Sequence, residues 1–188
     1  MQNNNTSVAE RIRKAKLLFA SGQIRESIRE FTVAEREGYE LVDIWLSRGA
    51  ALLALGHYKA AERDFSNVLQ VQRDNERAYY FRGISRAGQG HHQKAIDDLT
   101  QSLSRNNNRG IAHLIRGLSY AEMGNKSDAV LDINSAGAFS DAEFDSFTKL
   151  FGSMGHPFRN ARALLAEENA PWNNLLDKSS AEKLIKLL

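Results

Sequence analysis

The chain has 188 residues, enough for one compact domain or one short repeat array, and its 42% hydrophobic and 26% charged residues are typical of a folded globular protein. Its formal net charge is only +2, so no basic surface for nucleic acid is expected, and nucleic acid is not predicted as a partner. The absence of cysteine excludes disulfides, thiolate metal sites and a cysteine nucleophile.

The N-terminal residues 1–6 are rich in asparagine, and we expect them to be disordered. They lack the basic and apolar regions of a signal peptide. No apolar run approaches the roughly 20 residues needed to cross a bilayer. The sequence therefore predicts no membrane insertion and a cytoplasmic location, although a mature periplasmic protein without its leader would have the same features.

Four columns of residues recur at intervals of 34 along most of the chain. Each contains one kind of side chain. The column of glycines is Gly22, Gly56, Gly90 and Gly124. Seven positions before each glycine stands a small residue: Ala15, Gly49, Gly83 and Gly117. Five positions after each glycine stands another small residue: Ser27, Ala61, Ala95 and Ala129. Nine positions after each glycine stands a bulky apolar residue: Phe31, Phe65, Leu99 and Ile133.

Each 34-residue unit has the pattern of two amphipathic helices joined by a tight turn at the glycine. The small residues allow the helices to approach closely, and the bulky residue fills the space between them. Ser7 and Glu10 predict a capping box at the start of the first helix. We predict helix pairs at 8–20 with 24–37, 42–54 with 58–71, 76–88 with 92–104, and 110–122 with 126–137.

Residues of opposite charge also repeat, and the second member of each pair stands 16 residues after the first. The pairs are Lys14 with Glu30, Arg48 with Asp64, Arg82 with Asp98, and Arg116 with Asp132. We expect structural ion pairs between packed helices, either within a repeat or between neighbouring repeats. Breaking a buried pair of this kind costs about 3–5 kcal/mol, and breaking an exposed pair costs about 0–1 kcal/mol.

The last part of the chain leaves the 34-residue period. A helix is predicted from Ser140 to about Met154, and a final helix with the sequence AEKLIKLL follows Ser179. Because a repeat array needs a unit to cover its last apolar face, we predict that residues 141–188 form a helical cap or tail.

The repeat resembles the tetratricopeptide repeat family over about residues 8–141. The best match is the segment VDIWLSRGAALLALGHYKAAERDFSNVLQ, and the residues in the family's expected positions are Trp45, Gly49, Gly56, Tyr58, Ala61 and Phe65. The resemblance implies an all-α fold: a TPR-type helical solenoid of about four helix–turn–helix repeats with C-terminal capping helices. The repeats are expected at about 8–41, 42–75, 76–109 and 110–143.

Two features depart from the family pattern. Arg73 and Asn107 stand where a repeat usually ends in proline, and Arg11 and His113 replace an aromatic residue of the first helix. These changes affect the expected loop geometry and leave the expected fold unchanged.

The resemblance also implies a concave groove, lined by the first helix of each pair. The groove positions of the family correspond here to Ile12, Lys16, Phe19, Leu46, Ala50, Leu53, Tyr80, Ile84, Ala87, Leu114, Leu118 and Ala121, of which only Lys16 is polar. The residues expected to bind a partner are Lys16, Leu46, Arg77, Tyr80, Phe81, Ile84, Leu114 and Leu118. The implied function is a non-enzymatic protein–protein interaction module, an adaptor or chaperone-like scaffold, whose partner is a peptide or helix segment of another protein.

Three alternatives stay open at this stage. In the first, the residues at the groove positions are ordinary inter-helix core. In the second, the protein's own tail, AEKLIKLL, covers the groove. In the third, the chain is a structural assembly protein that self-associates as a homo-oligomer through its solenoid ends or C-terminal helices. Some relatives grip a C-terminal carboxylate with Lys, Asn and Arg. Only Lys16 and Arg77 have suitable chemistry here, so binding of such tails is not expected.

No pattern of catalytic residues is present in the sequence. His57, His91 and His92 stand at predicted turns, and no histidine pair has the spacing of a zinc protease. Asp97 and Asp98 are adjacent on a helix, so their side chains diverge by about 100°. We predict that the chain is not an enzyme and has no catalytic residue, cofactor or metal site.

Overall fold

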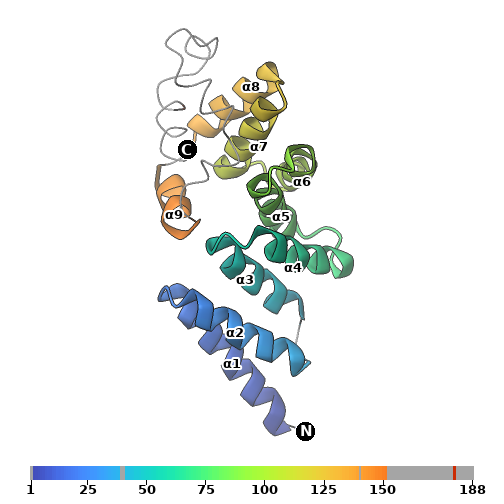
Figure 1. Cartoon of the computed structure of the whole chain (residues 1–188), viewed down its shortest axis with the longest axis vertical. Coiled ribbons are helices and arrows are strands. Elements are labelled where there is room, and N and C mark those ends of the chain that lie inside the picture. Colours follow the sequence, from blue (N-terminus) through green and yellow to red (C-terminus); the bar gives the residue numbers. More distant parts are fainter. Residues whose placement is uncertain (1, 39–40, 140, 152–179, 181–188) are drawn as a thin grey trace.

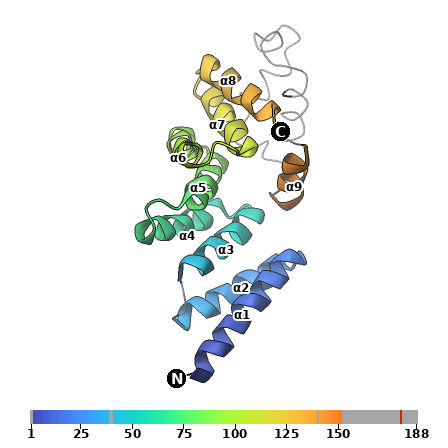
Figure 2. The ribbon, with the colours of Figure 1, turned by 180° about the vertical axis from the view of Figure 1, so that it is seen from behind.

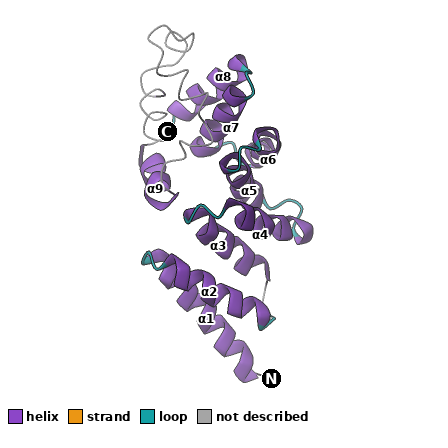
Figure 3. Ribbon diagram, in the orientation of Figure 1, coloured by secondary structure: helices purple, strands orange, loops and turns teal. Residues whose placement is uncertain are grey.

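The computed structural model describes residues 2–38, 41–139, 141–151 and 180. Within these ranges the regular structure is entirely helical (Figure 3). The helices are α1 (Gln2–Ala20), α2 (Ile24–Arg36), α3 (Leu41–Ala54), α4 (Tyr58–Val71), α5 (Glu76–Gly88), α6 (His92–Arg105), α7 (Gly110–Glu122), α8 (Lys126–Gly137) and α9 (Asp141–Phe151).

The first eight helices form four helix–turn–helix hairpins, which stack along the long axis of the molecule (Figure 1). Each hairpin turn contains a glycine of the 34-residue column, with a positive φ: 82° at Gly22, 71° at Gly56, 76° at Gly90 and 77° at Gly124. A residue with a Cβ rarely adopts this conformation, so glycine is what closes the turn within three residues. The predicted all-α solenoid of four helical repeats is confirmed.

The small-residue and bulky columns meet inside each hairpin. A Cβ at Gly83 would lie 2.7 Å from Leu99 Cγ, and one at Gly49 would lie 2.7 Å from the ring of Phe65. Both bulky side chains are fully buried. The glycines therefore set how closely the two helices of a hairpin approach.

The helices differ in how they contact their equivalents in the next hairpin. The first helices contact one another at every step, α1 with α3, α3 with α5 and α5 with α7, and the described residues show no comparable set among the second helices. Closer approach on one side bends the stack toward that side, so the first helices form its inner, concave face.

Apolar side chains form one large cluster and two smaller ones. The large cluster joins the second, third and fourth hairpins with α9. A separate cluster belongs to the first hairpin and receives one residue of α3, Ile44. The third lies between α4 and α5. The core is therefore continuous from α3 to α9 and separate in the first hairpin.

The structure differs from the sequence predictions at the N-terminal end. Helix α1 begins at Gln2, whereas the sequence predicts a start near residue 8 and disorder over residues 1–6. Ser7 lies inside the helix, so it does not cap the helix start. A helix that is already nucleated can add polar residues at little cost, and this explains the extension. The predicted final helix, AEKLIKLL, lies outside the described residues.

Candidate functional site

The candidate site is the inner wall of the solenoid, defined here as the side chains at the predicted groove positions of α1, α3, α5 and α7. Exposure varies along the wall. From α3 onward one column of equivalent residues becomes less exposed: Leu46 is half-buried, Tyr80 is 6% exposed and Leu114 is fully buried. Ile12, the equivalent residue on α1, is 7% exposed, and Leu53 of α3 is 2% exposed. The wall residues that are not buried, Lys16, Phe19, Leu46 and Ala50, all lie on α1 and α3, so the wall is partly open there.

Helix α9 covers part of the wall. It contacts α7 and α3, and Phe151 packs against Phe81 of α5 with ring centroids 6.2 Å apart. A helix that touches these three helices must cross the concave face. Figure 1 and the opposite view in Figure 2 both place α9 beside the stack, at the level between α3 and α7.

Aromatic side chains dominate the contact between α9 and the wall. Phe144 and Phe147 are 2% and 5% exposed, and both belong to the same apolar cluster as Tyr80 and Leu114. Phe151 packs on Phe147 at 4.9 Å as well as on Phe81. The surface that the sequence assigns to a partner is therefore partly occupied by a helix of the same chain.

The remaining predicted wall residues differ in their exposure. Ile84 and Leu118 are fully buried in the same cluster, and Phe81 is half-buried, between Phe65 at 5.5 Å and Tyr80 at 4.8 Å. Ile84 and Leu118 are therefore not accessible to a partner in this arrangement. Exposed wall area is found instead at α1 and α3.

The two cations predicted to contact a partner are both exposed, but only one has an ion pair in the described part of the chain. Lys16 donates to Asp43 of α3 across 2.6 Å, which joins the first two hairpins at the open part of the wall. Arg77 is exposed near the start of α5. Lys16 is thus paired with a carboxylate of its own chain, and the absence of tail binding stays a prediction.

Each ion pair with the 16-residue spacing joins the two helices of its own hairpin. Arg48 donates to Asp64 at 2.8 Å, Arg82 to Asp98 at 2.8 Å and Arg116 to Asp132 at 2.6 Å. The three aspartates are 3–4% exposed. In the first hairpin Lys14 reaches Glu30 at 2.7 Å, and there the lysine side chain is 64% exposed.

Each arginine of these ion pairs also reaches the preceding hairpin. Arg82 donates to Ser66 at 3.3 Å and Arg116 donates to Thr100 at 3.0 Å, and these hydroxyls stand 16 positions before the arginines. Arg48 donates to Glu35 of α2 at 3.1 Å. The sequence left open whether the pairs act within or between repeats, and the arginines do both.

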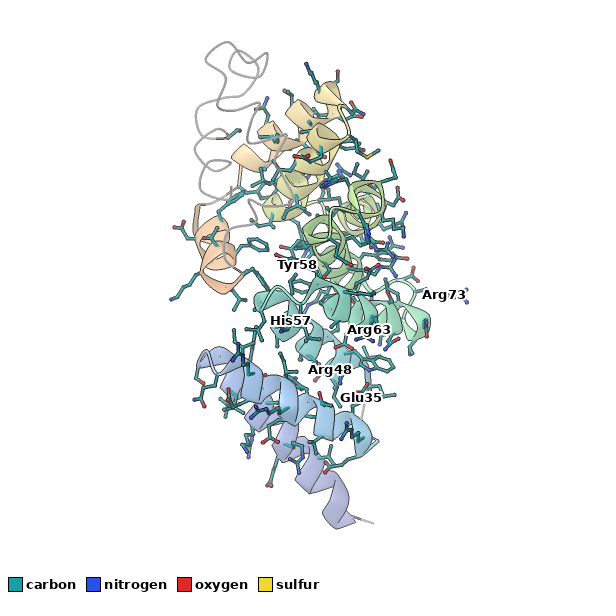
Figure 4. All side chains as sticks on the ribbon, in the orientation of Figure 1. Glu35, Arg48, His57, Tyr58, Arg63 and Arg73 are labelled. Atoms are coloured by element: carbon teal, nitrogen blue, oxygen red, sulfur yellow. The ribbon has the colours of Figure 1, made fainter. Side chains whose placement is uncertain are left out.

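Two carboxylates show how these contacts affect protonation. Hydrogen bonds from Arg48 hold the pKa of Glu35 below its ordinary value (both residues are labelled in Figure 4). The indole of Trp45 donates a further bond to Glu35 at 2.7 Å. Burial alone would raise the pKa of Asp132, but hydrogen bonds from Arg116 and His113 outweigh it and the pKa is lowered. Both groups are therefore charged, structural members of inter-helix networks.

His113 replaces the family's aromatic residue and joins the last of these networks. Its Nδ1 lies 3.0 Å from Asp132 Oδ1, and its Nε2 lies 3.2 Å from Asn107 Oδ1. The ring also stacks on Phe139 at 6.0 Å. Two departures from the family pattern, His113 and Asn107, thus form one contact that links α7 to the loop before it.

The three phenylalanines of α9 that pack on the wall are not among the site residues predicted from the sequence. Their spacing of three and then four positions places Phe144, Phe147 and Phe151 on one helix face. This signal was available in the segment DAEFDSFTKLF. It predicts a buried face, but it does not say which surface buries it.

Two observations concern other kinds of site. Across the described residues, no group of three or more His, Cys, Asp or Glu side chains is arranged to hold a metal ion. No helix in these ranges has both the length and the apolar character needed to cross a bilayer.

Comparisons with known proteins agree with the repeat pattern. The family model described as tetratricopeptide repeat matches residues 12–74, 46–103 and 82–143, which together exceed half of the chain. A search of curated proteins finds no match.

Several solved structures have a similar fold, and three of them are tetratricopeptide repeat or MamA proteins. A MamA protein is 20% identical, with a TM-score of 0.65 over 79% of this chain and 78% of that one. TTC0263, a thermophilic TPR protein in Thermus thermophilus, is 22% identical, with a TM-score of 0.60 over 95% and 99%. YrrB, a TPR protein with an unusual peptide-binding site, is 20% identical, with a TM-score of 0.60 over 65% and 63%. At these identities the likeness concerns the fold alone.

Proposed function

Because the chain belongs to the tetratricopeptide repeat family, we propose that it is a non-enzymatic protein–protein interaction module, an adaptor or chaperone-like scaffold that binds a partner segment along its inner wall. The observation behind this proposal is that the wall already accepts an apolar helix, α9. YrrB, described as having a peptide-binding site, is a structural neighbour.

The open part of the wall is where a partner would make first contact. Phe19, Leu46 and Ala50 are half-buried there, and Lys16 and Asp43 are about half exposed beside them. Apolar side chains flanked by a charged pair suit an amphipathic segment, which has an apolar face and a polar edge.

The experiment is capture of the partner from the source cells by the full chain, followed by a quantitative comparison of variants. Ala50→Arg places a long charged side chain on the open wall and is expected to reduce the captured partner at least tenfold. Arg29→Glu changes an exposed residue of α2, on the opposite side of the hairpin, and is the matched control. Circular dichroism must show equal helicity for both. Retention of the partner by Ala50→Arg would remove the wall from consideration.

One observation favours the alternative function, self-association in a structural assembly. Leu17 on α1 is 65% exposed, although its equivalents in the other three hairpins, Ala51, Ser85 and Ser119, are fully buried. A second copy that stacks on this face would cover it. Sedimentation of wild type and Leu17→Asp tests this: a dimer that Leu17→Asp dissociates supports assembly, and a monomeric wild type contradicts it.

A further inference from the structure

Helix α9 has two distinct faces. Its inner face presents Phe144, Phe147 and Phe151 to the wall. Its outer face contains exposed Asp145, Ser146 and Lys149, together with Leu150, which is 39% exposed. An amphipathic helix of this kind binds a groove through residues three and four positions apart.

The surface beneath α9 is apolar in its own right. Tyr80, Ile84, Leu114 and Leu118 form one cluster with Phe144 and Phe147, and Leu46 and Phe81 pack at its edge. Removal of α9 would uncover the part of this cluster that its phenylalanines cover, an apolar surface of a kind that soluble proteins cover with a partner.

The connection to α9 is short. Helix α8 ends at Gly137 and α9 begins at Asp141, so α9 is held close to the wall by the chain itself. A short tether gives an effective concentration of about millimolar. An external helix must compete with this tethered one, and its apparent affinity is its intrinsic affinity multiplied by the fraction of molecules in which α9 is displaced.

We propose that α9 is a displaceable intramolecular ligand, and that the partner is an amphipathic helix with three large apolar side chains, aromatic ones among them, spaced by three and four residues. This inference rests on the proposed function, because it assumes that the inner wall is the binding surface. It adds the chemistry of the partner and the element that controls access to the wall.

The test uses the full chain and a fluorescein-labelled peptide with the sequence of residues 141–151 as the probe. The variant Phe147→Asp with Phe151→Asp weakens the docking of α9 and leaves the wall unchanged. Fluorescence anisotropy is expected to show at least tenfold tighter binding of the probe to this variant than to wild type. Phe151→Ala replaces only one of the two phenylalanines changed in the double variant, so the probe should bind this variant with an affinity between those of wild type and the double variant.

Matched controls separate release of α9 from general loosening. Leu150→Asp changes the outer face of the same helix, so the probe should bind as weakly as it does to wild type. A probe with Phe147→Asp and Phe151→Asp should not bind to either protein. Phe81→Ala, added to the released variant, should reduce the gain, because Phe81 contacts Phe151.

Several outcomes would overturn the proposal. A released variant that keeps its helicity and its monomeric mass, yet binds the probe no more tightly than wild type, shows that α9 does not control access. An equal gain from Leu150→Asp shows that loosening alone is responsible. A released variant that dimerises, with no binding of the probe, shows that the wall takes a second copy. If any of these occurs while Ala50→Arg still loses its captured partner, the proposed function stands and only the role of α9 fails.

Discussion

Leu17 and Ala51 occupy the same position in consecutive hairpins, yet Leu17 is 65% exposed and Ala51 is fully buried. The equivalent Ser85 and Ser119 are also fully buried. The column of ion pairs shows the same contrast, because the side chain of Lys14 is 64% exposed and that of Arg82 is 16% exposed. The first hairpin thus has the sequence pattern of a repeat, but its residues at these two positions are more exposed than their equivalents in the other hairpins.

The boundary between hairpins differs in the same way. A cleft of about 380 Å³ lies between the first and second hairpins, where Ile28 of α2 and Leu52 of α3 form part of its lining. One repeat later the equivalent residues are Glu62 and Arg86, which form an ion pair at 2.8 Å. The contribution of a repeat position to stability therefore depends on whether a neighbour packs against it.

The largest expected effect tests this contrast at the buried ion pairs. Asp98 is 3% exposed and accepts hydrogen bonds from both Arg82 and Arg86 at 2.8 Å. Asp98→Ala leaves the guanidinium of Arg82 without its carboxylate and removes one of the two carboxylates that Arg86 contacts, and we expect it to lower the free energy of unfolding by about 3–5 kcal/mol. Urea denaturation followed by circular dichroism measures this change.

The control for this prediction is the equivalent site of the first hairpin. Lys14→Ala removes a mostly exposed cation from Glu30, and about 0–1 kcal/mol is expected. If Asp98→Ala and Lys14→Ala lowered the free energy of unfolding by similar amounts, burial of the ion pair would not distinguish the first hairpin from the third.

The second prediction concerns the close approach of the helices. Gly83→Ala would place a Cβ 2.7 Å from Leu99 Cγ and 3.3 Å from Asp98 Cβ, and Leu99 is fully buried. Overpacking of this kind costs about 1–3 kcal/mol, and the gain of about 0.5–1 kcal/mol from replacing a helical glycine offsets only part of it. A lower urea midpoint at unchanged slope is the expected result.

The first hairpin supplies the reciprocal variant, because it already has alanine at this position. Ala15 is fully buried opposite Phe31 in the same small cluster. Ala15→Gly should cost about 0.5–1 kcal/mol through backbone entropy. Stabilisation by Gly83→Ala would show that the third hairpin tolerates the same helix separation as the first.

Much of the fold could be predicted because its determinants are local. The predicted spans 58–71 and 126–137 coincide with α4 and α8, since glycines such as Gly56 and Gly124 mark the turn before each one. The start of α1 was predicted at the wrong residue because the polar residues before Ser7 carry no stop signal. Propensity alone does not limit a helix that its hairpin has already nucleated.

The candidate site was less predictable because its state depends on a contact between distant parts of the chain. The groove positions could be assigned from the repeat register, and they lie on the first helices that form the concave face. Nothing in the register indicates that Leu114 is fully buried while Leu46 is only half-buried. Nor does it indicate that α9 packs on the wall, because the amphipathic pattern of α9 predicts a buried face but not the surface that buries it.

The smallest expected effect has the opposite sign and applies to the first hairpin. Ser27 stands where the other hairpins have Ala61, Ala95 and Ala129. It is fully buried, and its hydroxyl has no hydrogen-bond partner among the described residues. An unsatisfied buried hydroxyl costs about 1–3 kcal/mol, so Ser27→Ala should stabilise the protein by about 1 kcal/mol, measured as a higher urea midpoint.

The matched control for Ser27 is another fully buried serine, one that has a partner. Ser85 donates to the carbonyl of Phe81 at 2.8 Å, so Ser85→Ala removes a hydrogen bond and should lower stability by about 0.5–1.5 kcal/mol. Opposite signs for the two serine variants would locate the unfavourable burial in the first hairpin. A loss at Ser27 equal to the loss at Ser85 would contradict this, because it would mean that both hydroxyls are satisfied. The first hairpin would then differ from the others only in what lies beside it.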